Sequence, residues 1–242
     1  MRYLLAFILL GVSTALFAER LPGWFIPLRE AVYEQQLSSD EIKKIYDKVK
    51  DSAQKELSGV ERDVILARCE YFMGRVFQEN KRNTEAILCY EQSITFAEKS
   101  LKTQKTTGAY EMIAGCIGQL CTLRPTGWVM ANGLRVEQNA RKALDADPAN
   151  AQASYFIASR WVFGPGVLGD PKRGLMEMQN ILDGPFNKEK DDYFNAYSAL
   201  GYGYIRLKKY DEARVWVQKA LEIYPTNKYA GEMLAKIQKA AK

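Results

Sequence analysis

An internal repeat constrains this chain more than any other feature of its sequence. Residues 69–100 align with residues 196–227 at a constant offset of 127 positions and without a gap. Glycine falls on glycine and alanine on alanine, and most large apolar residues meet large apolar residues. The coinciding pairs are Met73 and Leu200, Gly74 and Gly201, Phe77 and Tyr204, Ala86 and Ala213, Tyr90 and Val217, and Ser93 and Ala220. Self-similarity at a fixed offset predicts a repeated structural unit.

Each copy of the repeat predicts two antiparallel helices. Gly74 and Gly201 lie in the middle of the first helix, where a missing side chain lets a second helix approach closely. Ala86 and Ala213 are the matching small residues on that second helix. A short polar stretch supplies the turn between the helices, and Pro225 ends the second helix of the later copy. Large residues fill the space between the helices, namely Phe77, Tyr90, Tyr204 and Trp216.

This pattern resembles the tetratricopeptide repeat, a unit of 34 residues that forms a helix-turn-helix. Residues 194–227 match it most fully. The residues that carry the resemblance are Tyr197, Leu200, Gly201, Tyr204, Ala213, Ala220 and Pro225. Residues 67–100 form a second such unit, with Glu98 where the final proline is expected.

Two degenerate units are predicted between these two. Residues 107–149 carry an inserted loop of about ten residues between their helices, and residues 151–184 carry a Gly/Pro-rich loop with about four inserted residues. Residues 19–66 give N-terminal helices with a degenerate repeat, and residues 228–242 give an amphipathic capping helix. We therefore predict an all-α, tetratricopeptide-like helix-turn-helix solenoid of about four to five helix pairs with a C-terminal capping helix.

Residues 1–18 are typical of a secretory signal peptide. Arg2 supplies the positive start, Leu4–Ala18 is apolar, and Leu16–Ala18 offers a cleavage site. The apolar run is shorter than the ~20 residues that span a bilayer as a helix. We expect an exported protein of the periplasm or cell envelope of a bacterium, with no stable transmembrane segment after cleavage. An uncleaved anchor or an N-terminal core helix is the alternative.

The chain has no histidine. This excludes imidazole as base, nucleophile or metal ligand. No Gly-rich phosphate loop and no nucleophile elbow occurs, and the net charge of +5 is scattered along the chain. We predict no enzymatic activity, no catalytic residue, no metal, no cofactor and no nucleic-acid partner.

Four cysteines allow three disulfide pairings, and the sequence does not choose among them. Cys69, Cys89, Cys116 and Cys121 are spaced by 20, 27 and 5 positions, which fits neither a zinc site nor a redox motif. All four lie in apolar helical runs, which favours unpaired buried thiols.

The resemblance implies a concave groove, lined by the first helix of each unit, that binds a protein or peptide partner. Aromatic, Arg and amide side chains suit such a surface, and an ordinary solvated face is the alternative. The predicted groove residues are Arg68, Tyr71, Arg75, Glu111, Gln119, Gln152, Tyr155, Ser159, Asn195, Ser198, Tyr202 and Arg206. The function predicted from this groove is that of an adaptor or scaffold for other envelope proteins.

The two insertions favour a second hypothesis. Both lie between the helices of consecutive units and carry apolar residues, which could close over a small ligand or fold back onto the helices. The residues concerned are Trp128, Trp161, Phe163 and Leu168. The Gly-Pro-Gly segment is similar to helical-repeat subunits of periplasmic solute-uptake systems of the TRAP type. The alternative function is therefore a periplasmic, small-ligand-binding accessory subunit.

Overall fold

The computed structural model describes residues 21–166 and 169–240. The predicted signal peptide lies outside these residues. The described chain folds into a short 3₁₀ helix, η1, followed by α-helices. Their bounds are η1 Gly23–Phe25, α1 Ile26–Glu34, α2 Ser39–Glu56, α3 Gly59–Glu79, α4 Asn83–Thr103, α5 Thr107–Leu123, α6 Thr126–Asn132, α7 Leu134–Ala146, α8 Ala151–Phe163, α9 Pro171–Asp183, α10 Lys190–Arg206, α11 Tyr210–Ile223 and α12 Lys228–Ala240.

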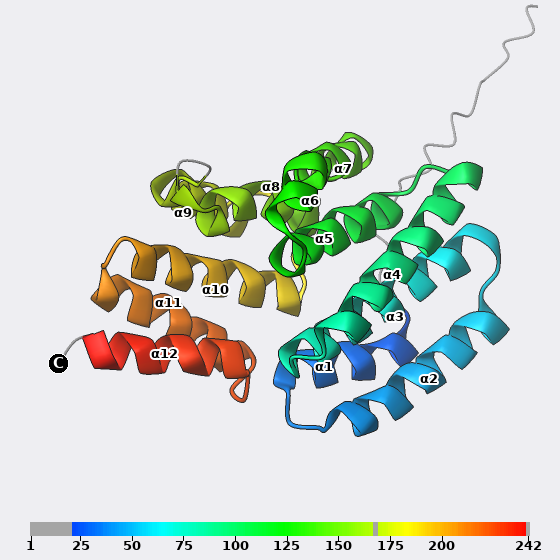
Figure 1. Cartoon of the computed structure of the whole chain (residues 1–242), viewed down its shortest axis with the longest axis horizontal. Helices are drawn as coiled ribbons and strands as arrows, with labels where there is room; N and C mark the ends of the chain where they lie inside the picture. The colour runs from blue at the N-terminus through cyan, green and yellow to red at the C-terminus, as the bar shows by residue number, and fades with distance from the viewer. Residues whose placement is uncertain (1–20, 167–168, 241–242) are drawn as a thin grey trace, which may run out of the picture.

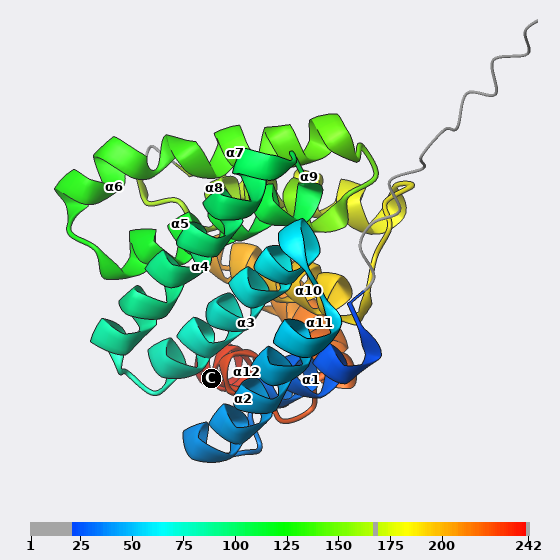
Figure 2. The ribbon, with the colours of Figure 1, turned by 90° about the vertical axis from the view of Figure 1, so that its right-hand side faces the viewer.

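The helices form consecutive pairs. α1 packs on α2, α3 on α4, α5 on α7, α8 on α9 and α10 on α11, and α12 covers the last pair. In Figure 1, α1–α4 lie at one end, α10–α12 at the other, and α5–α9 connect them across the top. Figure 2 shows the layer of α5–α9 above α1 and α2. The predicted all-α, tetratricopeptide-like solenoid with a capping helix is confirmed.

The repeated glycines lie where the two helices of a unit touch. A β-carbon on Gly74 would lie 2.6 Å from Cε1 of Tyr90, and one on Gly201 would lie 2.5 Å from Cγ2 of Val217. Tyr90 and Val217 are fully buried. The contact therefore exists only because the first helix has no side chain at this position.

The turn between the two helices repeats as well. Lys81 and Lys208 occupy equivalent positions and adopt the left-handed region, with φ of 59° and 58°. The second helices of the two units differ in length. α11 ends at Ile223, two residues before Pro225, whereas α4 continues past Glu98 to Thr103. A glutamate at position 98 permits the extra turn that proline forbids.

The first insertion is helical, which corrects the expectation of a loop. Residues 126–132 form α6, which begins directly after Pro125 and whose Asn132 side-chain amide donates to the carbonyl of Trp128 at 3.0 Å. Trp128 packs, half-buried, against the cluster that contains Tyr90 and Leu120. Burial of this ring explains why the segment folds back onto α4 and α5.

No helix within the described ranges combines the length and apolar character needed to cross a membrane. The four cysteines are present as thiols, with Cys69 and Cys116 buried.

Two mid-helix glycines offer a matched test of the helix contacts. We expect Gly201→Ala to destabilise the fold by about 1–3 kcal/mol, because the new methyl overlaps Val217. Gly118→Ala, in α5, should stabilise it by up to about 1 kcal/mol, because nothing lies within 4 Å of the added carbon. Urea unfolding of the two variants measures both changes, and equal effects would contradict the packing described.

Candidate functional site

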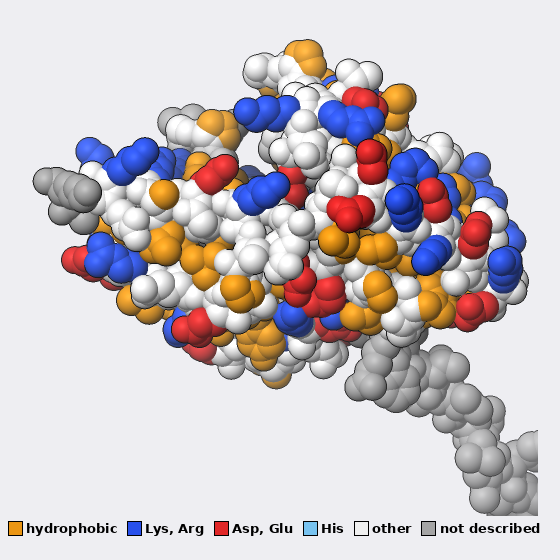
Figure 3. All heavy atoms as spheres, turned by 90° about the horizontal axis from the view of Figure 1, so that it is seen from below, with side chains coloured by type: hydrophobic (Ala, Val, Ile, Leu, Met, Phe, Trp, Pro, Cys, Tyr) orange, Lys and Arg blue, Asp and Glu red, His pale blue; other side chains and the backbone are white. Residues whose placement is uncertain are grey.

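The first helices of the units turn one side toward the middle of the molecule. Seen from below in Figure 3, the surface is hollowed between α10–α12 and the remaining helices. Tyr71, Tyr155 and Tyr202, from α3, α8 and α10, are half-buried on these helices. Tyr229, at the start of α12, is 41% exposed. We call this set of tyrosines, together with Arg75 of α3, the inner face.

The residues of the inner face lie close enough to influence one another. Burial raises the pKa of the Tyr155 hydroxyl, and the neighbouring hydroxyl of Tyr71 adds to this, while Arg75 opposes it. Burial also raises the pKa of Tyr229, with Tyr155 and Tyr202 as its neighbours. Tyr155 and Tyr202 pack against one hydrophobic cluster, and Tyr71 and Tyr202 pack against another, so the tyrosines of α3, α8 and α10 are neighbours.

Gly115 of α5 explains how the helices come so close there. A β-carbon on Gly115 would lie 2.9 Å from Phe156 and 3.2 Å from Tyr71. The two rings therefore rest on the bare backbone of α5, which brings α3 and α8 to either side of it.

Arg68 and Glu111, both predicted to face the groove, instead form a largely buried ion pair. Nη2 of Arg68 lies 2.9 Å from Oε2 of Glu111, with side-chain exposures of 16% and 6%. The side-chain amide of Asn150 donates to the same carboxylate at 2.5 Å, and its oxygen caps α8 by accepting from the backbone N–H of Ala153 at 2.7 Å. This cluster ties α3, α5 and α8 together. Asn150 is not among the residues predicted from the sequence, although its position before α8 is a typical N-cap signal.

The other predicted groove residues are divided between surface and interior. Gln119 and Gln152 are half-buried. The Ser159 hydroxyl donates to the carbonyl of Phe156 within α8, and Ser198 is buried. Nη1 of Arg206 donates to the carbonyl of Val162 at 2.6 Å and so holds the end of α8.

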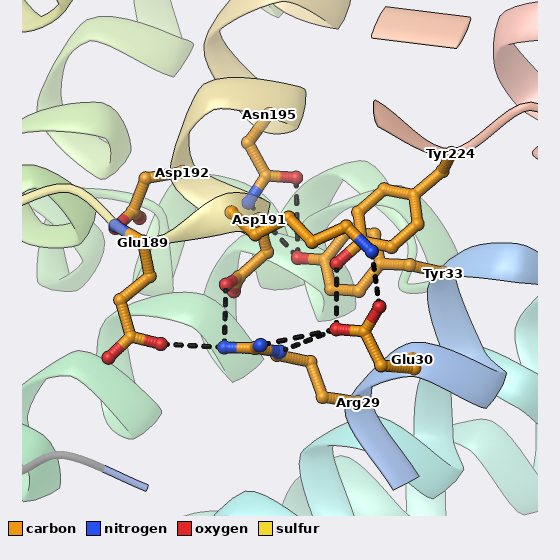
Figure 4. Close-up of polar contacts among 9 residues, drawn as sticks. Arg29, Glu30, Tyr33, Glu189, Asp191, Asp192, Asn195 and Tyr224 are labelled. Atoms are coloured by element: carbon orange, nitrogen blue, oxygen red, sulfur yellow. Dashed lines mark hydrogen bonds and ion pairs between the residues drawn. The ribbon is translucent and has the colours of Figure 1, made fainter. Parts of the chain in front are cut away.

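Helix α1 closes one end of the inner face. Figure 4 shows Arg29 of α1 directed at the start of α10. Its Nη1 lies 2.6 Å from Oε2 of Glu189 and 3.4 Å from Oδ1 of Asp191. Glu30 on the next position pairs with Lys190. Only 9% of the Arg29 side chain is exposed, so these ion pairs are partly shielded from water.

Tyr33, one turn further along α1, is enclosed by the last unit. Its ring stacks on Tyr224 with centroids 5.0 Å apart, and meets Phe194 edge-on at 5.4 Å. The side-chain amide of Asn195 donates to its hydroxyl at 3.1 Å, and the guanidinium of Arg75 covers its ring at 4.5 Å. Asn195 and Arg75, both predicted to face an open groove, therefore contact α1.

The end of α1 is capped by the turn before α12. The side-chain amide of Asn227 donates to the carbonyl of Tyr33 at 2.8 Å, and the backbone N–H of Lys228 donates to Oε1 of Gln35 at 2.7 Å. We call α1 together with its contacts to α10 and to the turn before α12 the clasp. It joins the first helix to the last unit, so the groove expected to be open is closed by the chain itself at this end.

The residues of the second insertion lie in different surroundings. Phe163, 39% exposed, lies on Tyr202 with ring centroids 5.0 Å apart. Trp161 lies between the guanidinium groups of Arg160 and Arg173, at 4.3 and 4.0 Å. Leu168 lies outside the described residues. The two insertions do not meet over a common pocket in the described chain, since Trp128 packs on α4 and α5.

Asp192, beside the clasp, has an unusual acidity. It is the third residue of α10 and forms a capping box with Glu189, the N-cap residue. Its Oδ2 accepts from the backbone N–H of Glu189 at 2.9 Å. Burial, followed by the nearby carboxylates of Asp191 and Glu111, raises the pKa of Asp192 to about 7. A carboxyl group thus titrates near neutral pH in a chain without histidine.

We expect the clasp to contribute strongly to stability. Arg29→Met should lower the free energy of unfolding by about 2–4 kcal/mol, because it leaves Glu189 and Asp191 without their cation. Arg141→Met, which removes an exposed ion pair with Glu137 at 2.6 Å, should cost less than about 1 kcal/mol. Urea unfolding compares the two, and hydrogen exchange in α10–α12 should rise only for the first.

The raised pKa of Asp192 predicts a pH dependence with a definite sign. The folded protein binds this proton more tightly than the unfolded chain, so the contribution of Asp192 to stability is fully present below the pKa of an ordinary aspartate and is lost as pH rises through about 7. We expect Asp192→Asn to raise the melting temperature at pH 8 and to flatten its change between pH 8 and pH 6. The exposed Asp211→Asn is the control. A wild-type pH profile retained in the Asp192 variant would contradict this assignment.

Comparison with known proteins agrees with this architecture. Residues 194–227, which comprise most of α10, all of α11 and the turn before α12, match the family model described as tetratricopeptide repeat. No curated protein matches the chain. The matched residues coincide with the unit identified from the glycine, alanine and proline pattern, and the helix pairs before it stack in the same manner. The chain therefore contains a tetratricopeptide repeat in residues 194–227, within a stack of helix pairs.

Proposed function

We propose that this protein is an exported, non-enzymatic adaptor that binds a segment of another envelope protein on its inner face. A tetratricopeptide repeat supports a role in protein–protein interaction in general. The observation that carries the specific proposal is the inner face itself. Tyr155, Tyr202 and Tyr229 form no hydrogen bond through their hydroxyls within the described part of the chain.

The composition of this face is that of a binding surface. Tyrosine and arginine are enriched at the centres of protein interfaces, because each combines a large contact area with polar atoms. The clasp limits where a partner can bind. Since α1 covers the end near Asn195, the accessible part lies around Tyr155, Tyr202 and the exposed Tyr229.

The proposed location rests on the sequence of residues 1–18. A positive start, a short apolar run and small residues at its end are typical of a cleaved leader. The absence of histidine supports a non-catalytic role. The partner is accordingly proposed to be a protein of the periplasm or cell envelope.

Site-specific photo-cross-linking tests the adaptor function. A photoreactive phenylalanine analogue replaces Tyr229 at the inner face or Leu88, which is 61% exposed on α4. We expect one reproducible cross-linked protein from position 229 and none of that mass from position 88. The same product from both positions, or from neither, would contradict binding at the inner face.

Fractionation of the same cells tests the location. We expect the chain in the periplasmic or membrane fraction, with an N-terminus that begins near Glu19. A cytoplasmic protein that retains residues 1–18 would contradict export, without affecting the cross-linking result.

One observation favours the accessory-subunit alternative. Phe163 of the second insertion packs on Tyr202 of the inner face, which brings that insertion to the edge of the same space. A loop in this place could cover a small ligand. Native mass spectrometry of the purified protein would support this alternative if a small molecule is released on denaturation.

A further inference from the structure

The guanidinium of Arg75 differs from the other enclosed arginines of the described chain. Arg29, Arg68 and Arg75 have side-chain exposures of 9%, 16% and 16%. Arg29 and Arg68 each donate to carboxylates at hydrogen-bond distance. Arg75 donates no hydrogen bond within residues 21–166 and 169–240. Its nearest carboxylate oxygen, Oε1 of Glu79, is 3.8 Å from Nη2.

A guanidinium that is mostly removed from water without an acceptor is costly, and such groups call for an explanation. With 16% of its side chain exposed and no acceptor at hydrogen-bond distance in the described residues, Arg75 keeps guanidinium donors that solvent can reach. The fully enclosed side-chain atoms that lack a partner in the described chain belong to Arg68, Arg124, Asp147 and Ser198, and Arg75 is not among them. The guanidinium of Arg75 therefore has donors available to a bound molecule.

The surroundings of Arg75 restrict what that molecule can be. Tyr33 covers one side of the guanidinium at 4.5 Å, which leaves the donors along its edge for an acceptor. Tyr71 lies one turn before Arg75 on α3, and both are near enough to Tyr155 to influence the pKa of its hydroxyl. Glu79 lies between Arg75 and Lys228, so its charge offsets part of theirs. One uncompensated positive charge with aromatic walls suits a monoanion that carries a flat apolar body.

We infer that Arg75 and the tyrosines around it form a binding site for a small aromatic or ring-bearing monocarboxylate. The planar fork of arginine matches the two oxygens of a carboxylate, and the rings of Tyr71 and Tyr155 contact the body of the ligand. Phosphate monoesters fit less well, because their second negative charge lacks a second cation. This inference rests on the proposed function, in which the inner face is the binding face. It concerns the part of that face around Arg75 rather than the exposed part around Tyr229.

Isothermal titration calorimetry of the mature chain with trans-cinnamate and indole-3-acetate tests the site, with cinnamamide and indole-3-acetamide as matched neutral probes. We expect the acids to bind and the amides to bind at least about tenfold more weakly, because a charge-assisted hydrogen bond is lost. Absence of binding by both acids, or equal binding of acid and amide, would overturn the inference.

Two variants assign the effect to Arg75. Arg75→Gln should weaken binding of the acids at least about tenfold, whereas Arg82→Gln, on an exposed arginine, should leave it unchanged. Arg75→Lys keeps the charge but loses the fork, and should bind with intermediate affinity. It serves as the test if the glutamine variant does not fold, as judged by circular dichroism. Unchanged affinity in a folded Arg75 variant would overturn the assignment.

A peptide arm identifies the source of the carboxylate. An octapeptide ending in phenylalanine with a free carboxylate should bind no more tightly than trans-cinnamate if the site takes a free solute. Tighter binding of the peptide by tenfold or more would overturn the assignment to a small molecule. Cross-linking from position 229 in the Arg75→Gln chain separates the two proposals. If this chain no longer binds the acids but still cross-links to the partner, Arg75 is needed for the small ligand and not for the adaptor function.

Discussion

The enclosure of Tyr33 by the last repeat is the contact on which the shape of the inner face depends. A stack of helix pairs is by itself a one-dimensional array in which each unit touches only its neighbours. Here the stacking of Tyr33 on Tyr224 joins the first helix to the last unit across 191 positions of sequence, and Arg29 reinforces it by pairing with Glu189 and Asp191. The two ends of the solenoid are therefore coupled, and the curvature of the stack is fixed rather than free to vary.

The same closure determines which polar groups become structural and which remain available. The pair of Arg68 with Glu111, completed by Asn150, lies where three units meet, and its atoms are committed to holding α3, α5 and α8 together. Arg75, two turns further along α3, is held by the ring of Tyr33 but has no acceptor in the described chain. A shielded ion pair stabilises only when its geometry is good and its remaining donors are satisfied. Arg68 is paired with Glu111, although its buried Nε has no partner in the described chain, whereas Arg75 has no acceptor there at hydrogen-bond distance, and this contrast supports the binding role proposed for Arg75.

The fold could be predicted from the sequence because its determinants are local and repeat. Gly74 and Gly201 mark the helix contact, and Pro225 marks the end of a unit, so short windows of sequence contain the necessary information. The helical insertion α6 could not be predicted in this way. Its seven residues show too little periodicity, and burial of Trp128 against another unit decides its conformation.

The candidate site was only half predictable for a related reason. Helical periodicity predicts that Tyr71, Tyr155 and Tyr202 lie on the same side of successive first helices, and in the structure Tyr202 packs against the same clusters as Tyr71 and Tyr155. It does not show that α1 would fill the end of that space, because no pattern in residues 26–34 refers to Asn195 or Tyr224. Contacts between the ends of a chain depend on the summed rotation of every unit between them. A change in the packing at Gly115, where Tyr71 and Phe156 rest on α5, would therefore also shift the position of the clasp.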